Sequence, residues 1–215
     1  MKSIQRALAI LLASALLLAG CGTASSVNPS SNNPQSQENP GKQDNGIVIG
    51  ASWQDLKNEY IKGLADAAES YSAKRGITLL STDGAGNPEN QISQVETFIT
   101  QGVDAIILNP YDSDGCVPAA AKAKEAGIPL ILVCSVLSDM SSVTSFVGSN
   151  DETAGELIAQ LIVDTIGGKG NVVILRGPNG HSAEVNRSKG IYTILEKNPD
   201  VKVLYDQTAN WDRAE

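Results

Sequence analysis

The stretch that decides the fold is residues 104–114, DAIILNPYDSD. The consecutive apolar residues 105–108 predict a strand buried on both faces, which is typical of the centre of a parallel sheet covered by helices. The strand must end at Asn109-Pro110, because proline cannot continue a central strand. Asp112, Ser113 and Asp114 offer capping side chains to a helix over residues 117–126. We therefore expect Asn109 at the carboxyl end of a buried strand, where open α/β sheets bind ligands.

The rest of the chain alternates apolar runs with helical patterns. Strands are predicted at residues 47–51, 77–80, 104–108, 128–133, 143–148, 171–175 and 201–205, and helices between 57 and 76, from 88 through 99, and at 117–126, 153–166 and 182–197. This alternation requires parallel strands joined by right-handed crossovers. The predicted fold class is α/β with doubly wound parallel sheets.

The N-terminal segment indicates export. Residues 1–20 combine Lys2 and Arg6 with an apolar stretch too short to span a bilayer, which predicts a signal peptide. Residues 18–21, LAGC, resemble a bacterial lipobox, and this resemblance implies cleavage before Cys21 and lipid attachment to its sulfur; a plain secretory signal is the alternative. Residues 21–46 are rich in Ser, Asn, Gln, Pro and Gly, which predicts a flexible tether. We expect an exported lipoprotein, anchored to the membrane through Cys21.

Composition argues against several functional classes. The net charge is −8 and no basic stripe is present, so nucleic acid is not an expected partner. The only histidine, His181, lies in a predicted loop without a nucleophile motif, and we expect no enzyme and no catalytic residues. The glycine-rich residues 167–170 follow a helix and precede a strand, whereas phosphate loops follow a strand, so they predict a turn.

Besides Cys21, two cysteines remain, Cys116 and Cys134. An even pair could form a disulfide, and the sequence leaves both states open. With these two cysteines and one histidine, we expect no metal site. No motif predicts a cofactor.

Polar and aromatic residues gather after the predicted strands. They are Ser52 and Trp53 after the first strand, Asp83 after the second, Asn109 after the third, Cys134 and Ser135 after the fourth, Asn186 and Arg187 on a helix, and Trp211 and Asp212 after the last. Amides, hydroxyls, a guanidinium and flat rings suit a neutral polyhydroxylated ligand, whose hydroxyls accept directional bonds while its C–H face stacks on a ring.

Several motifs together resemble a known family. They are residues 109–114 (NPYDSD), 126–129 (AGIP), 148–151 (GSND) with Gly155, 170–174 (GNVVI), 181–187 (HSAEVNR) and 189–190 (KG). The chain from residue 47 onward resembles the periplasmic sugar-binding proteins of ABC importers, the ribose-binding-protein-like family. The resemblance implies a type I periplasmic binding fold, in which two α/β lobes joined by a hinge close on a sugar. The lobes would be residues 47–148 and 149–215.

The resemblance also implies a ligand site. Ser52, Asn58 and Tyr60 would line the cleft, Asn109 would bond a sugar hydroxyl, Arg187 would be the ligand-binding arginine and Trp211 a stacking aromatic. Trp53 and Ser135 complete the predicted ligand-binding set. Cys134-Ser135 stands where the family often has an Asp-Arg pair, and the loop after Ser52 is longer than in ribose binders. These departures favour another sugar, a polyol or an inositol-like ligand over ribose.

The chain departs further from the family in its length. About 170 residues follow the tether, whereas two complete lobes need about 250. We expect an incomplete second lobe that exposes apolar faces, with weak or absent ligand binding by this chain.

The leading functional hypothesis is a lipid-anchored receptor that delivers a sugar or polyol to the subunits of an ABC permease by hinge closure. A receptor that presents its ligand to a chemosensor or kinase fits the same residues. A transcription regulator with this fold would need an N-terminal helix-turn-helix and a basic surface, and the lipobox and the net acidity argue against it.

Overall fold

The computed structural model describes residues 46–212 and residue 214. These residues belong to one compact unit, residues 43–215. The predicted signal peptide, the lipid attachment at Cys21 and nearly all of the predicted tether lie outside the described residues.

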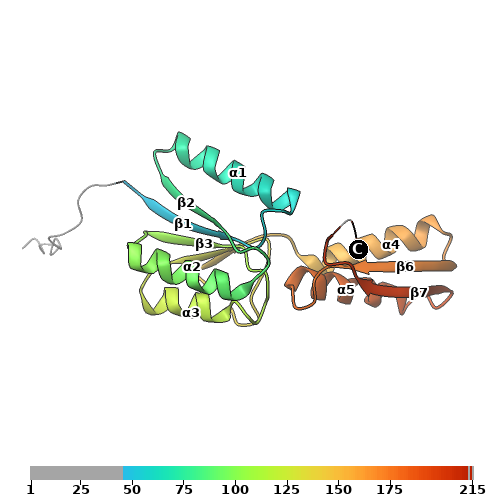
Figure 1. Ribbon diagram of the computed structural model, residues 1–215. Coiled ribbons are helices and arrows are strands. Elements are labelled where there is room, and N and C mark those ends of the chain that lie inside the picture. Colours follow the sequence, from blue (N-terminus) through green and yellow to red (C-terminus); the bar gives the residue numbers. More distant parts are fainter. Residues whose placement is uncertain (1–45, 213, 215) are drawn as a thin grey trace, which may run out of the picture. The chain divides into compact units, whose positions relative to one another are not determined.

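The first sheet region, residues 47–148, is built on five parallel strands in the order β2-β1-β3-β4-β5. The strands are β1 (Val48–Trp53), β2 (Thr78–Asp83), β3 (Ala105–Leu108), β4 (Leu130–Val133) and β5 (Ser145–Val147), and the helices are α1 (Glu59–Lys74), α2 (Pro88–Gln101) and α3 (Val117–Glu125). Helix α1 covers one face of the sheet, while α2 and α3 cover the other (Figure 1). This is the predicted doubly wound arrangement, with its switch in strand order between β1 and β3.

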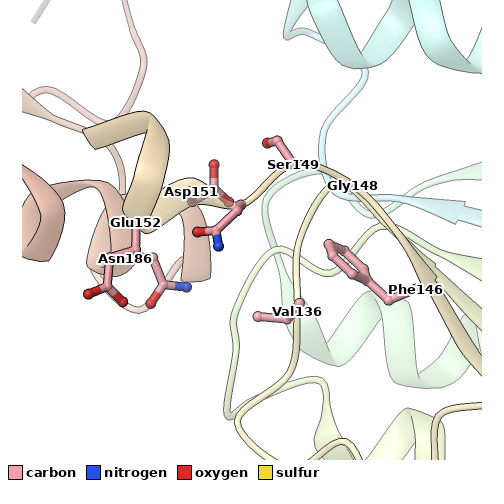
Figure 2. A pocket seen from close by; sticks show the side chains of 8 residues that line it. Val136, Phe146, Gly148, Ser149, Asp151, Glu152 and Asn186 are labelled. Carbon is pink, nitrogen blue, oxygen red and sulfur yellow. The ribbon is translucent and has the colours of Figure 1, made fainter. Parts of the chain in front are cut away.

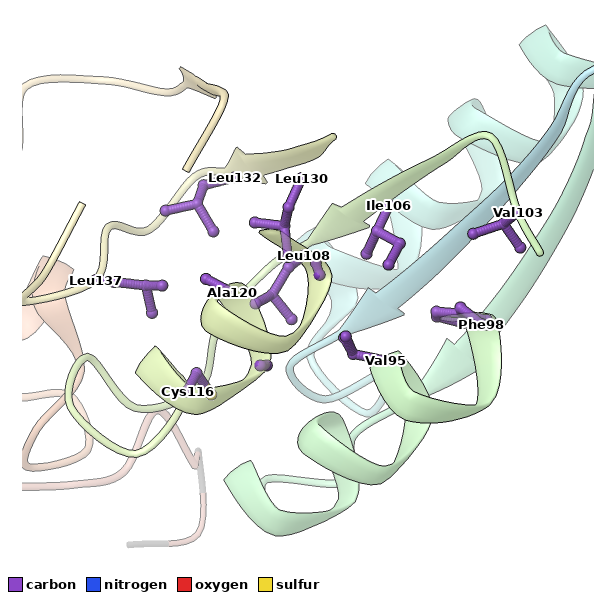
Figure 3. Packing of buried hydrophobic residues seen from close by; sticks show 12 residues of the cluster. Val95, Phe98, Val103, Ile106, Leu108, Cys116, Ala120, Leu130, Leu132 and Leu137 are labelled. Atoms are coloured by element: carbon purple, nitrogen blue, oxygen red, sulfur yellow. The ribbon is translucent and has the colours of Figure 1, made fainter. Parts of the chain in front are cut away.

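Strand β3 lies at the centre of this region, as its sequence predicts. Ile106 and Leu108 are fully buried in the larger core cluster, together with side chains of α2 and α3 (Figure 3). Ile107 points to the opposite face and packs against the cluster of α1. A run of apolar residues is needed here because helices cover both faces of the sheet.

Local sequence signals set the ends of the helices. Asn87 caps α2 by accepting from Glu89 N–H, with Pro88 in the first helical turn. Gly76 follows α1 with φ of +67°, a conformation that glycine adopts at little cost. The predicted turn at residues 167–170 is confirmed, since α4 ends before it and Gly167 has φ of +70°.

Two local predictions are wrong. The sequence placed Ser52 and Trp53 in a loop, but β1 continues through both residues by pairing with β2 as far as Asp83. Asp112 was expected to help cap α3; instead its carboxylate accepts from the N–H groups of Asp114 and Gly115 in the preceding turn. The residue at the N-cap position is Cys116, whose side chain makes no capping bond.

The second sheet region, residues 149–212, contains α4 (Asp151–Thr165), β6 (Gly170–Arg176), α5 (Ser182–Leu195) and β7 (Val201–Thr208). Strands β6 and β7 form a separate two-stranded parallel sheet. Exposed apolar side chains are numerous here, on α4 and on both strands, which confirms the expected exposure of apolar faces. The predicted lobe boundary at residues 148/149 coincides with the change of sheet and stays a prediction.

Both cysteines of the described chain are free. Cys116 is buried, and Cys134 is partly buried at the end of β4. The disulfide that the sequence left open is therefore not formed in this structure.

Candidate ligand cleft

A cleft of about 590 Å³ lies where four strands end. Its walls come from the segments that follow β1, β3, β6 and β7, so both sheets contribute their carboxyl ends. The lining residues are Gln54, Asp55, Lys57, Asn58, Glu59, Tyr60, Tyr111, Pro178, Asn210, Trp211 and Asp212. Three aromatic rings thus share the cleft with amides, carboxylates and one ammonium group. This is the ligand-binding edge of an α/β sheet.

Asn109, which the strand-end pattern predicts at this edge of the sheet, lies behind the cleft wall. Its side chain is fully buried. The amide oxygen accepts from the Gln54 N–H at 3.4 Å, and the amide nitrogen donates to the Val133 carbonyl at 2.9 Å. Asn109 therefore ties the segment after β1 to the end of β4, which fixes the position of Gln54 in the wall.

Ser52 and Trp53 are also buried. The Ser52 hydroxyl donates to Gln94 Oε1 at 2.7 Å and accepts from Gln91 Nε2 at 3.2 Å. The Trp53 indole N–H donates to Ser81 Oγ at 3.0 Å, and its ring belongs to the core under α1. Neither side chain lines the cleft.

Asn58 and Tyr60 line the cleft, as the resemblance implied. The Asn58 amide oxygen caps α1 by accepting from Tyr60 N–H at 3.0 Å, which fixes where the helix begins. The Tyr60 hydroxyl lies 3.8 Å from Cys134 Sγ. The pKa of Tyr60 is raised, first by this hydrogen bond and the charge of the thiolate form, while the nearby Arg187 guanidinium acts in the opposite direction.

Arg187 forms an ion pair with Asp151. Both Arg187 Nε and Nη2 lie 2.8 Å from Asp151 Oδ1, and the guanidinium is about half exposed. Its charge acts on Tyr60, on Cys134 and on His181, which places it close to the cleft although it is outside the cleft lining. The structure therefore brings Arg187 near the other predicted site residues but commits it to a carboxylate.

Ser135 and His181 meet behind the cleft. The Ser135 hydroxyl lies 3.1 Å from His181 Nε2, and Gln54 Oε1 lies 2.7 Å from the same nitrogen. His181 Nδ1 accepts from the Ala183 N–H, so the ring proton is on Nε2. Burial lowers the pKa of His181 to about 4, so the ring is neutral at physiological pH. Trp211 packs edge to face on this ring, with centroids 4.4 Å apart.

A second, smaller hollow of about 420 Å³ lies beside the segment that connects the sheets. Figure 2 shows Val136 and Phe146 from the first sheet region on one side of it, and Glu152 and Asn186 from α4 and α5 on the other. It contains no aromatic ring besides Phe146. The larger cleft is the better candidate for a ligand with both hydroxyls and a C–H face.

Comparison with known proteins shows to which family this chain belongs. The periplasmic binding protein domain matches residues 49–215. The chain belongs to the periplasmic binding protein family. Family membership implies an extracytoplasmic location.

Curated relatives are binding proteins. The xylitol-binding protein of Mycolicibacterium smegmatis is 41% identical over 167 residues, which cover 78% of this chain and 47% of the relative. The ribose import binding protein of Bacillus subtilis is 32% identical, with 77% of this chain and 53% of the relative covered. This chain thus spans about half the length of these relatives. Both relatives are named as binding proteins, which confirms the expectation that this chain is a binding protein and not an enzyme.

Solved structures agree with the fold. An ABC transporter solute binding protein from Bacillus halodurans with bound myo-inositol superposes with a TM-score of 0.76 and 31% identity, over 80% of this chain and 61% of that one. The α/β type I periplasmic binding fold predicted from the motifs is therefore confirmed.

Several lining residues of this periplasmic binding protein domain are not among the site residues predicted from the sequence. Gln54 and Asp55 follow β1 directly, and Tyr111 follows β3 two residues after Asn109. The rule that selected Asn109, a polar or aromatic residue after a strand, could have found all three. The sequence assigns His181 to a family motif and to no part of the ligand site, because its contact with Gln54 spans 127 positions.

Within the described residues, no helix combines the length and apolarity needed to cross a bilayer. The same residues contain no group of three or more His, Cys, Asp or Glu side chains placed to hold a metal ion.

Proposed function

We propose that the whole protein binds a sugar or polyol in the cleft and delivers it to the permease of an ABC importer. The observation that carries this proposal is the cleft itself, which joins four strand ends and sets Tyr60, Tyr111 and Trp211 among hydrogen-bonding groups. Rings take the C–H face of a polyhydroxylated ligand, and the polar groups take its hydroxyls. Relatives named for xylitol and ribose, and a structure with bound myo-inositol, support this ligand class.

We assign the predicted site residues to two roles. Asn58, Tyr60 and Trp211 contact the ligand directly, because their side chains line the cleft. The remaining predicted residues shape the wall or approach it from behind: Ser52, Trp53, Asn109, Ser135 and Arg187. Arg187 could reach a ligand hydroxyl with the part of its guanidinium that stays exposed, while Asp151 fixes its direction.

Helix α1 offers a matched pair of tyrosines for the test. Tyr60 lies in the cleft, whereas Tyr71 is similarly exposed on the same helix and stacks with Arg75 instead. Binding of xylitol, ribose and myo-inositol should be measured by calorimetry and by thermal shift, up to high millimolar concentration because the chain spans half of its relatives.

At these high concentrations at least one of the ligands should raise the melting temperature of the wild-type protein, even though we expect its binding by this chain to be weak. Tyr60→Ala should weaken its binding by about 1 kcal/mol, the worth of one stacked ring, and Tyr71→Ala should leave binding unchanged. A folded wild-type protein that responds to none of the ligands would contradict the proposal. An equal loss in both variants would remove Tyr60 from the site.

The lipid anchor is a separate part of the proposal. The lipobox and the tether support attachment of the exported protein to a membrane through Cys21. Cells fed an alkyne analogue of palmitate should label the wild-type protein and not Cys21→Ala. Equal labelling of both would disprove attachment at this residue.

A further inference from the structure

His181 is the only histidine of the chain, and all of its polar ring atoms are engaged. The residue is 2% exposed at the start of α5. Its Nε2 meets Gln54 Oε1 at 2.7 Å and Ser135 Oγ at 3.1 Å, and both partners belong to the first sheet region. Its Nδ1 accepts from the Ala183 N–H, within α5. The imidazole thus joins the second sheet region to the first.

The same ring contacts Trp211 in the cleft wall. The two rings meet edge to face at 78°, an arrangement that aromatic pairs favour. On another side the indole lies against Gly177, where an added Cβ would come within 2.3 Å of Trp211 Cε2. Trp211 also has φ of +56°, which is uncommon for a bulky residue. Contacts with its neighbours must therefore hold it in this conformation.

We propose that His181 is the positioning residue of Trp211. It holds the indole in the cleft wall and makes that position depend on its own hydrogen bonds to Gln54 and Ser135. The second sheet region therefore presents its stacking ring only while it is joined to the first region at this point.

Neighbouring contacts fix His181 from both sides. Gly180 accepts from the Ser113 N–H at 3.0 Å, and the Ser182 hydroxyl accepts from the Val136 N–H at 2.9 Å. Residues 180–182 therefore meet the first sheet region at successive positions. His181 adds to these bonds a contact with a residue that lines the cleft.

The charges around the imidazole are consistent with this role. Burial and Arg187 of α5 lower the pKa of His181, while Asp112, from the segment after β3, raises it. The balance leaves the ring neutral near pH 7. A neutral ring with its proton on Nε2 donates to the Gln54 amide oxygen, as the geometry requires.

The consequence for ligand affinity rests on the proposed function. Gln54 and Trp211 both line the cleft, one from each sheet region. Release of His181 would displace the ring from the wall and would weaken stacking on a sugar or polyol. The position of Trp211 itself can be measured without any ligand.

The test uses fluorine NMR of the protein labelled with fluorotryptophan. The chain has two tryptophans, and buried Trp53 is the internal reference. His181→Asn keeps a capping side chain for α5 but removes the ring. Gln54→Leu removes the acceptor of His181 and leaves the backbone bonds of residue 54 in place. Val185→Ala, at an exposed position of α5, is the control.

The proposal predicts that His181→Asn and Gln54→Leu both shift the Trp211 resonance toward that of solvent-exposed tryptophan, with Trp53 and Val185→Ala unchanged. An unchanged Trp211 in His181→Asn would mean that His181 only caps the helix, and would overturn the proposal. An unchanged Trp211 in Gln54→Leu would overturn the dependence on the first sheet region. Gln54→Leu does not alter the cap, so it also tests the idea if His181→Asn fails to fold.

Titration of the same variants with xylitol separates the two proposals. Several-fold weaker binding by His181→Asn than by the wild-type protein would support both. If the wild-type protein binds no polyol while the Trp211 shifts occur, the proposed function fails and the role of His181 stands. Equal binding by wild type and His181→Asn, with Trp211 displaced, would overturn the link to affinity.

Discussion

Strands β3 and β6 carry nearly the same apolar run and meet different surroundings. Residues 105–108 read AIIL and residues 172–175 read VVIL. In β3, Ile106 and Leu108 are fully buried, because two strands and two helix layers surround them. In β6, Leu175 is 71% exposed, because among the described residues β6 pairs with β7 alone and helices α4 and α5 pack on one face of this sheet. The pattern predicts a strand, but the neighbouring layers decide its burial.

The covered face of the second sheet region is nevertheless tightly packed. Helices α4 and α5 touch through glycines: a Cβ on Gly155 would lie 2.1 Å from the Arg187 carbonyl oxygen, and one on Gly190 would lie 2.1 Å from that of Glu152. The backbones can approach this closely only without side chains at these positions. The two sheet regions therefore differ in how many faces of the sheet are covered by helices, and not in how closely the covering helices pack.

The largest expected effect contrasts Leu108 with Leu175. Leu108→Ala should lower the free energy of unfolding by about 3 kcal/mol, because it leaves a cavity in a full core. Leu175→Ala should change it by less than about 0.5 kcal/mol, because the side chain is already in solvent. Urea unfolding measures both. A large loss in Leu175→Ala would show that this face is covered in solution.

The next effect concerns pH and the junction at His181. Its pKa is about 4 in the folded protein and 6.5 when unperturbed, so the unfolded chain binds the proton first as pH falls. The contribution of His181 to the free energy of unfolding is therefore fully present above pH 6.5 and is lost between 6.5 and about 4, by up to about 3 kcal/mol.

Urea unfolding of wild type and His181→Asn across this window isolates that contribution. The wild-type protein should lose more stability on acidification than the variant. Amide exchange should accelerate in the second sheet region, because protonation weakens its junction with the first. Parallel pH profiles for the two proteins would be incompatible with a buried neutral His181.

The smallest expected effect compares two helical glycines. Gly155→Ala should destabilise the second sheet region by about 1–3 kcal/mol, because the new methyl group meets backbone of α5. Gly63→Ala in α1 should stabilise the first region by about 0.5–1 kcal/mol, since nothing lies within 4 Å of the added Cβ. Thermal unfolding followed by circular dichroism checks both signs. A neutral Gly155→Ala would show that α4 and α5 are less closely packed than described.

Part of the site could be predicted from the sequence. The strand-end pattern predicts Trp211, the family resemblance adds Asn58 and Tyr60, and all three line the cleft. Ser52 and Trp53 were predicted to follow β1, but both belong to it, because pairing with β2 extends the strand beyond the apolar run that predicts it. His181 could not be assigned, because its role depends on Gln54, Ser135 and Trp211, none of which is near it in sequence.

The sequence by itself determined the order of strands and helices, the caps at Asn87 and Gly76, and the family. These features depend on residues within a few positions of one another, so local patterns contain them. The tertiary structure decided which apolar strands are buried and which polar residues face the cleft. Within residues 104–114, the apolar run predicted the strand, whereas the burial of Asn109 became visible only once Gln54 and Val133 lay beside it.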